Sequence, residues 1–211
     1  MPLTPAELWR ARLGTAAALG FVLSMALAIV RYPVDASGRG YDFFAHYWCD
    51  LFDPVSESGM LNPARWWAVL GMAALGLGLA SSFWSLRSEL RGSVTALGLL
   101  GSFGVAAVAV VTALGLLDLH LALILGTGPA GLLGLVLGIV LQKRRGAFAA
   151  ARSGYVLLAL GAWNFVQYAR QAVGGAERWS GLPAVQKAAT LALLVWLLVG
   201  LWLPARRDVG K

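Results

Sequence analysis

Long apolar runs alternate with short polar segments along the whole chain. Each run has about the 20 residues that a helix needs to cross a bilayer, and Lys, Arg, Pro or Gly residues bound it. The pattern therefore predicts an all-α integral membrane bundle of six transmembrane helices, which forms a single domain over residues 1–211. The expected spans are 13–30, 66–86, 94–117, 119–141, 155–173 and 183–203.

The predicted outer loop, residues 31–65, contains the polar stretch YDFFAHYWCDLFDP. With a helical period its acidic side chains fall on one face and its aromatic side chains on the other. This spacing predicts a short amphipathic helix over residues 42–53 that lies in the membrane interface and ends before Pro54. Its polar face would carry Asp42, His46, Asp50 and Asp53. A polar face that is simply exposed to water is the alternative interpretation.

Composition supports a membrane protein. The chain is 59% hydrophobic and 13% charged, and its mean hydropathy is +0.72, values outside the range of ordinary soluble domains. The single cysteine, Cys49, excludes an intrachain disulfide.

The distribution of charge predicts the orientation. If the N-terminus is cytoplasmic, the cytoplasmic segments hold eleven Lys and Arg against three acidic residues, whereas the outer segments hold six against seven. The positive-inside rule then predicts a multi-pass protein of the cytoplasmic (inner) membrane with both termini in the cytoplasm. The basic loop QKRRGAFAAAR is best explained by orientation and contact with anionic lipids. No nucleic-acid partner is expected.

Polar side chains of the predicted spans gather in the outer half of the membrane, together with those of the outer loop. Polar groups in lipid are costly unless they find one another or water, so this pattern predicts an outward-facing polar pocket. Arg170 and Lys187 would supply the positive charges opposite the acidic helix. The candidate pocket residues are Asp42, His46, Asp50, Asp53, Asp118, His120, Asn164, Gln167, Arg170 and Lys187.

Three functions compete for this pocket. The first is binding of a lipid headgroup or small polar ligand without a cofactor. The second is a metal-dependent membrane hydrolase for a lipid ester or amide, because imidazole and carboxylate groups bind zinc. A small-solute transporter is the third, although the inner half of the spans lacks ionisable residues. Membrane lipids are the expected partners, with a second membrane protein or another copy of the chain as further candidates. The candidate metal ligands are His46, Asp50, Asp118 and His120.

Two segments carry a resemblance to a known family. DFFAHYWCDL and GMLNPAR, which includes Asn62 and Pro63, are similar to the outer-loop segment of bacterial six-span membrane proteins catalogued as domain of unknown function nine-nine-eight. The resemblance implies a six-span bundle with both ends inside and no assigned chemistry. A looser likeness connects the chain to the membrane hydrolases that include alkaline ceramidases, which use Ser, Asp and several His around zinc. This chain has two histidines and no HxxxH motif.

Overall fold

The computed structural model describes residues 4–85, 92–175, 177 and 179–202. Within these residues the chain forms α-helices, one short 3-10 helix and one isolated bridge between Val55 and Leu61, with no strand. The all-α prediction is confirmed. The six α-helices of this part of the chain are α1 (Pro5–Arg31), α2 (Arg65–Ser85), α3 (Gly92–Ala113), α4 (Leu117–Arg144), α5 (Phe148–Gly174) and α6 (Leu182–Trp202).

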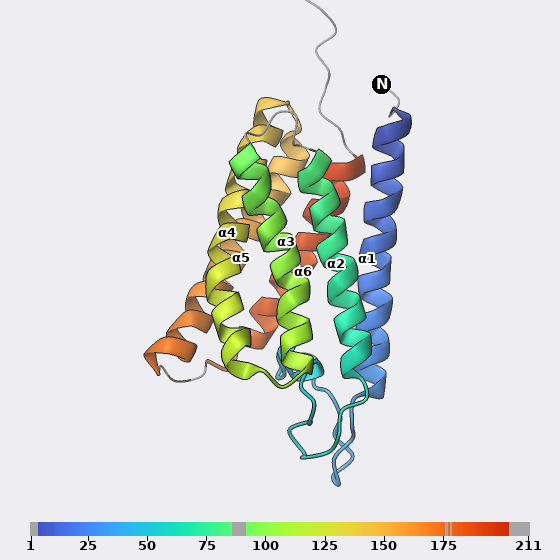
Figure 1. The fold of residues 1–211 in the computed structure, drawn as a ribbon, viewed down its shortest axis with the longest axis vertical. Coiled ribbons are helices and arrows are strands. Elements are labelled where there is room, and N and C mark those ends of the chain that lie inside the picture. Colours follow the sequence, from blue (N-terminus) through green and yellow to red (C-terminus); the bar gives the residue numbers. More distant parts are fainter. Residues whose placement is uncertain (1–3, 86–91, 176, 178, 203–211) are drawn as a thin grey trace, which may run out of the picture.

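The helices run alternately up and down and follow the chain order around a bundle (Figure 1). Each helix packs on the next one in sequence, and α6 packs back against α1 and α2. This order closes a ring of helices around a central space. The long loop 32–64 lies at the lower end in Figure 1, where α1 ends and α2 begins.

Five of the described helices are long and apolar enough to cross a membrane: α1, α4 and α6 over their full lengths, residues 65–84 of α2 and residues 95–113 of α3. Each overlaps one of the predicted spans: 13–30 and 119–141 lie within α1 and α4, whereas 94–117 runs past the end of α3 at Ala113, and residues 86 and 203 of the predicted spans 66–86 and 183–203 lie outside the described residues. The remaining predicted span, residues 155–173, lies inside α5, which does not meet the same limit of length and composition. α5 includes Arg152, Asn164, Gln167 and Arg170, and these polar side chains lower its hydropathy.

The first helix starts earlier than its apolar run. The hydroxyl of Thr4 accepts a hydrogen bond from the amide of Glu7 at 3.3 Å, and the Glu7 carboxylate accepts one from the Thr4 amide at 2.8 Å. This reciprocal capping box, followed by Pro5, satisfies amides that a helix N-terminus otherwise leaves unbonded. The helix therefore begins before residue 13, where the apolar run begins.

Glycines bring α3 and α4 into backbone contact. A Cβ atom added to Gly101 would lie 2.5 Å from Cα of Gly131, and one added to Gly134 would lie 2.9 Å from Cα of Gly98. These distances are too short for a side chain, so the helices meet through small residues, as expected of helices that pack in a membrane. Gly138 differs, because its added Cβ would meet the Trp196 ring at an ordinary 3.7 Å.

The predicted helix over residues 42–53 is not formed. This stretch folds as turns followed by the 3-10 helix η1 (Cys49–Leu51). The Asp42 carboxylate accepts hydrogen bonds from the amides of Phe44 and Ala45 at 2.8 and 3.0 Å, and these side-chain bonds compete with a helix. A helix of about 12 residues is marginal on its own, and Tyr47 and Trp48 bond to side chains of α5 and α6.

Candidate functional site

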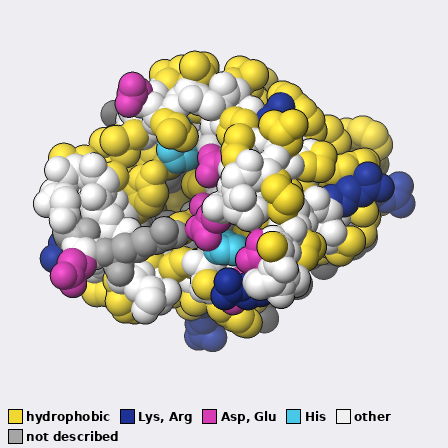
Figure 2. All heavy atoms as spheres, turned by 90° about the horizontal axis from the view of Figure 1, so that it is seen from below, with side chains coloured by type: hydrophobic (Ala, Val, Ile, Leu, Met, Phe, Trp, Pro, Cys, Tyr) yellow, Lys and Arg dark blue, Asp and Glu magenta, His cyan; other side chains and the backbone are white. Residues whose placement is uncertain are grey.

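A cavity of about 340 Å³ occupies the space inside the ring of helices. Side chains from α2, α3, α4, α5 and α6 form its wall, and residues of the loop form a roof at one end. Figure 2, which views this end of the molecule, shows a hollow with an apolar floor and with acidic and histidine side chains at its edge. The apolar wall includes Leu75, Leu79, Val105, Leu135, Leu157 and Leu193.

The cavity is elongated along the bundle. On α6 its wall runs from Gln186 near the loop to Trp196, and ten helical residues correspond to about 15 Å. Phe83 of α2 and Trp196 close the deep end, with ring centroids 6.1 Å apart. The shape suits a narrow apolar chain better than a compact solute.

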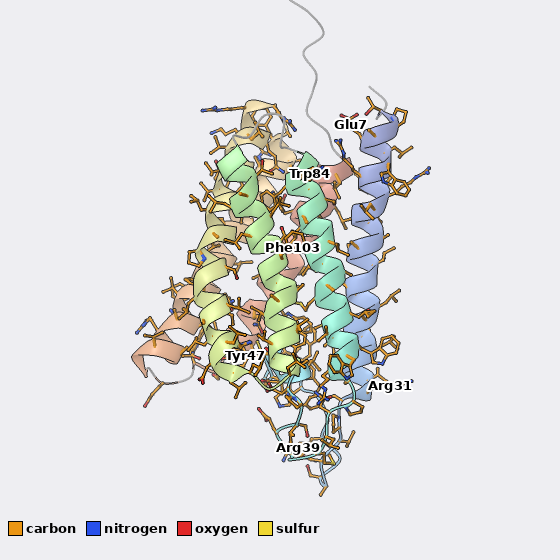
Figure 3. All side chains as sticks on the ribbon, viewed as in Figure 1. Glu7, Arg31, Arg39, Tyr47, Trp84 and Phe103 are labelled. Atoms are coloured by element: carbon orange, nitrogen blue, oxygen red, sulfur yellow. The ribbon has the colours of Figure 1, made fainter. Side chains whose placement is uncertain are left out.

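Trp48, Cys49 and Phe52 of the loop roof the cavity. The Trp48 amide donates a hydrogen bond to Oε1 of Gln186 at 2.8 Å, and its indole Nε1 donates to Oγ1 of Thr190 at 3.0 Å. Two bonds from one residue thus fix the roof to one face of α6. Figure 3 shows the neighbouring Tyr47 at this end of the bundle and Trp84 at the other.

Asn62 holds the base of the roof. Its Nδ2 donates to the carbonyls of Leu51 and Asp53 at 3.1 and 2.9 Å, and its Oδ1 accepts from the Ala64 amide at 3.0 Å. The side chain is buried, so it satisfies backbone groups that would otherwise be unbonded. Asn62 therefore joins the 3-10 turn to the start of α2.

Lys187 is the buried cation of this end, with 6% of its surface exposed. Its Nζ donates a hydrogen bond to the carbonyl of His46. It also lies 5.0 to 5.5 Å from the centroids of three rings, a distance typical of cation–π contacts. These rings belong to Tyr41, Phe43 and Trp48. Lys187 was expected to face acidic groups, and its contacts with a carbonyl and with aromatic rings were not foreseen.

His120 is the buried histidine of the described chain, at 7% exposure. Its Nδ1 is hydrogen-bonded to Oγ1 of Thr112, and its Nε2 lies 3.2 Å from the hydroxyl of Tyr168. The imidazole thereby connects the end of α3, the first turn of α4 and the outer part of α5. Tyr168 lines the cavity, whereas His120 stands behind it.

The four candidate metal ligands are not gathered in one site. Asp118 is exposed, His120 is engaged by Thr112 and Tyr168, and His46 lies in the loop with its Nε2 3.2 Å from Oε2 of Glu57. Among the residues that the structure describes, no group of three or more His, Cys, Asp or Glu side chains is placed to hold a metal ion. Among the described residues His46, Asp50, Asp118 and His120 are therefore not assembled as a single centre.

Acidic groups of the loop experience two different environments. Burial, with the nearby charges of Asp50 and Glu57, raises the pKa of Asp53 to about 6. Hydrogen bonds from the amides of Phe44 and Ala45 instead hold the pKa of Asp42 below its usual value. Burial, reinforced by the negative charges of Asp50 and Asp53, raises the pKa of the Cys49 thiol to about 12. A thiol in this state is a poor nucleophile.

The candidate pocket residues thus separate into several positions. Asn164 lines the cavity, and His120 is hydrogen-bonded to Tyr168, which also lines it. Lys187 of α6 is hydrogen-bonded to the carbonyl of His46 in the loop. Asp42, Asp118 and Arg170 are exposed, while Asp50, Asp53 and Gln167 are half-buried. The candidate set omitted the cavity residues Trp48, Tyr168, Gln186 and Thr190. Helical spacing was the available signal, because Asn164 and Tyr168 on α5, like Gln186 and Thr190 on α6, stand four residues apart.

Together, the fold and the cavity define an all-α protein with five described helices that could cross a membrane and a largely apolar internal space. Comparison of the chain with protein-family models, with curated proteins and with solved structures finds no match.

Proposed function

We propose that the chain is a six-span integral membrane protein that binds a lipid or another amphiphile inside its helix ring. The apolar part of the ligand would occupy the cavity, and its polar end would lie below the roof. The single observation that carries this proposal is the elongated cavity of about 340 Å³, apolar along its length and roofed by the loop. Pockets for small ligands have similar volumes and similar walls.

The sixth span of this proposal is α5. It has 27 residues, which at 1.5 Å per residue is about 40 Å and exceeds the hydrocarbon thickness of a bilayer. It packs between α4 and α6 and leaves apolar side chains exposed on its outer side. These include Val156, Trp163 and Val166. Its polar residues Asn164 and Tyr168 line the cavity instead.

The proposed orientation places both termini in the cytoplasm and the loop outside, because the excess of Lys and Arg lies at the end opposite the loop. Single cysteines in a Cys49→Ser background test it. In intact cells a membrane-impermeant maleimide should label Ser37→Cys and should label Lys143→Cys only after the membrane is opened. The reverse pattern would invert the orientation.

The wall favours binding over hydrolysis. The lining side chains include no carboxylate and no imidazole among the described residues, so the groups that most often act as general acid or base are missing from the surface that a ligand would touch, where Cys49 and Tyr168 are the ionisable side chains. The second candidate function, a metal-dependent hydrolase, has lost its predicted ligand set.

Native mass spectrometry of the protein with its co-purifying lipids tests the proposal. Gly161 lines the cavity, and a Cβ added there would meet Leu132 at an ordinary 3.6 Å, so Gly161→Leu should fill the space without a backbone clash. Gly126→Leu is the matched control, since its added Cβ meets nothing within 4 Å and Gly126 is exposed. Bound lipid should be lost from Gly161→Leu alone. Equal lipid in all three proteins would contradict binding in the cavity.

A further inference from the structure

We propose that the cavity selects an uncharged amphiphile with a hydroxyl group on a single apolar chain, and that this hydroxyl donates a hydrogen bond to Oη of Tyr168. The inference rests on the proposed function and names the class of ligand. It derives from the hydrogen-bonding state of the polar groups in the cavity wall.

Charge and volume limit the ligand first. The described lining side chains include no Lys, Arg, Asp, Glu or His, and a charged headgroup placed among them would lose its hydration without gaining a counter-charge. The volume, about 340 Å³, stands at the low end of the range for ligand pockets, about 300–1,000 Å³. One chain fits this space better than two.

Most polar groups of the wall are already engaged. The hydroxyls of Ser102, Thr127 and Thr190 each donate to a carbonyl of their own helix at 2.7 to 2.9 Å. Thr190 and Gln186 also accept the two hydrogen bonds of Trp48. The amide nitrogen of Gln186 and two groups on α5, Asn164 and Tyr168, remain for a ligand. Asn164 makes no hydrogen bond to another described residue, and Tyr168 contacts His120.

The direction of the Tyr168 bond follows from its neighbours. The Thr112 hydroxyl donates its hydrogen to the carbonyl of Val108 at 2.7 Å, so it accepts from Nδ1 of His120. A neutral imidazole with hydrogen on Nδ1 has an acceptor at Nε2. The hydroxyl of Tyr168 therefore donates to Nε2 across 3.2 Å.

Tyr168 consequently has no hydrogen left to give a ligand. Its oxygen retains acceptor capacity, and it lines the cavity one helical turn from Asn164. A ligand at this position must supply a hydrogen, as an alcohol does and as an ether or a carboxylate does not. Thr112 and His120 act as positioning residues, because they fix Tyr168 as an acceptor without lining the cavity.

Competition binding tests the inference, with tritiated 1-dodecanol as the probe on the purified full-length protein in detergent. The unlabelled competitors are 1-dodecanol, dodecyl methyl ether and sodium dodecanoate, which share one chain length. We expect the alcohol to bind about 5- to 10-fold more tightly than the ether, the range of one hydrogen bond, and the carboxylate to bind least. In Tyr168→Phe the ratio of alcohol to ether should fall close to one. Tyr155→Phe, at an exposed tyrosine of the same helix, should keep the wild-type ratio.

A second variant separates the effect of the hydrogen bonds that join Thr112, His120 and Tyr168 from an effect of packing. Thr112→Val removes the acceptor of Nδ1, so His120 can carry its hydrogen on Nε2 and donate to Tyr168, which then has a hydrogen for the ether. The ether should bind more tightly to this variant than to wild type, a gain that a purely structural role of Thr112 would not produce.

The outcomes are distinguishable. Saturable binding with equal affinity for alcohol and ether, or a ratio that survives Tyr168→Phe, would overturn the inference and leave the proposed function standing. Absence of saturable binding of the probe in wild type would overturn the inference, and only together with equal co-purifying lipid in wild type, Gly161→Leu and Gly126→Leu would it overturn both.

Discussion

The indole of Trp48 donates a hydrogen bond to Oγ1 of Thr190 across 3.0 Å, although 142 positions separate the two residues in the chain. The bond joins the roof of the cavity to its wall. Together with the bond from the Trp48 amide to Gln186, it makes one aromatic residue a double connection between the loop and α6, beside the contact of Lys187 with His46.

Replacement of Trp48 by Phe should loosen the roof. The ring would still fill the space, but the bond to Thr190 would be lost, at a cost of about 1 kcal/mol in the free energy of unfolding. Labelling of Cys49 by a maleimide, slow in the native protein because burial suppresses the thiolate, should accelerate about fivefold through easier local opening. Trp163→Phe, at an exposed tryptophan of α5, is the control. An unchanged labelling rate in Trp48→Phe would mean that other contacts hold the roof.

Lys187 and Asp50 should be energetically coupled. Lys187 donates a hydrogen bond to the carbonyl of His46. The Asp50 carboxylate accepts a hydrogen bond from the amide of Tyr47, the residue after His46, at 2.6 Å. Both side chains therefore stabilise the same turn. Lys187→Leu should lower the free energy of unfolding by about 1–3 kcal/mol through loss of a charged hydrogen bond and of cation–π contacts. The loss should be smaller when Asp50→Asn is already present. A double-mutant cycle in a denaturant titration measures the difference, and additive effects would contradict the coupling.

Asp53 should make the protein more stable in mild acid. Its pKa is about 6 in the folded state and about 3.9 in an unfolded chain, so the folded state binds more protons between these values. This contribution to stability is then largest below about pH 4 and is lost as pH rises through 6. Asp53→Asn should remove the slope and raise stability at pH 7 to 8.

Asp42→Asn should change the dependence of stability on pH in the opposite direction. Hydrogen bonds lower the pKa of Asp42 in the folded state, so its contribution is present above the unfolded value and is lost as pH falls. Midpoints of thermal unfolding from pH 2 to 8 measure both variants. A slope that persists in Asp53→Asn would assign the acid stabilisation to another group.

Gly101→Ala should disturb the contact between α3 and α4. The added methyl group would lie 2.5 Å from Cα of Gly131, which is backbone and cannot move aside alone. Overpacking of this kind costs about 1–3 kcal/mol. Gly126→Ala on α4, where the added Cβ meets nothing within 4 Å, should be neutral or slightly stabilising. Thermal unfolding in one detergent compares the two, and equal midpoints would mean that the helices separate freely.

The sequence was sufficient to predict the helices, because an apolar run long enough to cross a bilayer usually forms an α-helix, which satisfies its own backbone groups. The loop could not be predicted in the same way. A helical period over residues 42–53 is compatible with a helix, but Asp42 caps a turn and Trp48 bonds to α6 instead. Such choices depend on partners more than a hundred residues away.

The cavity, like the loop, could not be predicted from the sequence. Polar residues were expected to converge, and some do, yet the space between them is mainly apolar because α3 and α4 meet through glycines and leave the centre of the ring unfilled. Hydropathy identifies which residues enter the membrane and does not show which gaps stay open. The acceptor state of Tyr168 depends on a chain from Val108 through Thr112 and His120, which only the fold brings together.

The order of synthesis determines when the contacts of Lys187 can form. The ribosome makes His46 141 residues before Lys187, so the loop exists without its attachment while four more helices are produced. Trp48 packs on Phe21 of α1 but lacks its bonds to Gln186 and Thr190 during that interval, and the wall of the cavity is complete only when the last helix arrives. A chain that stalls before α6 would therefore leave the amide and the indole of Trp48 and the carbonyl of His46 without their α6 partners.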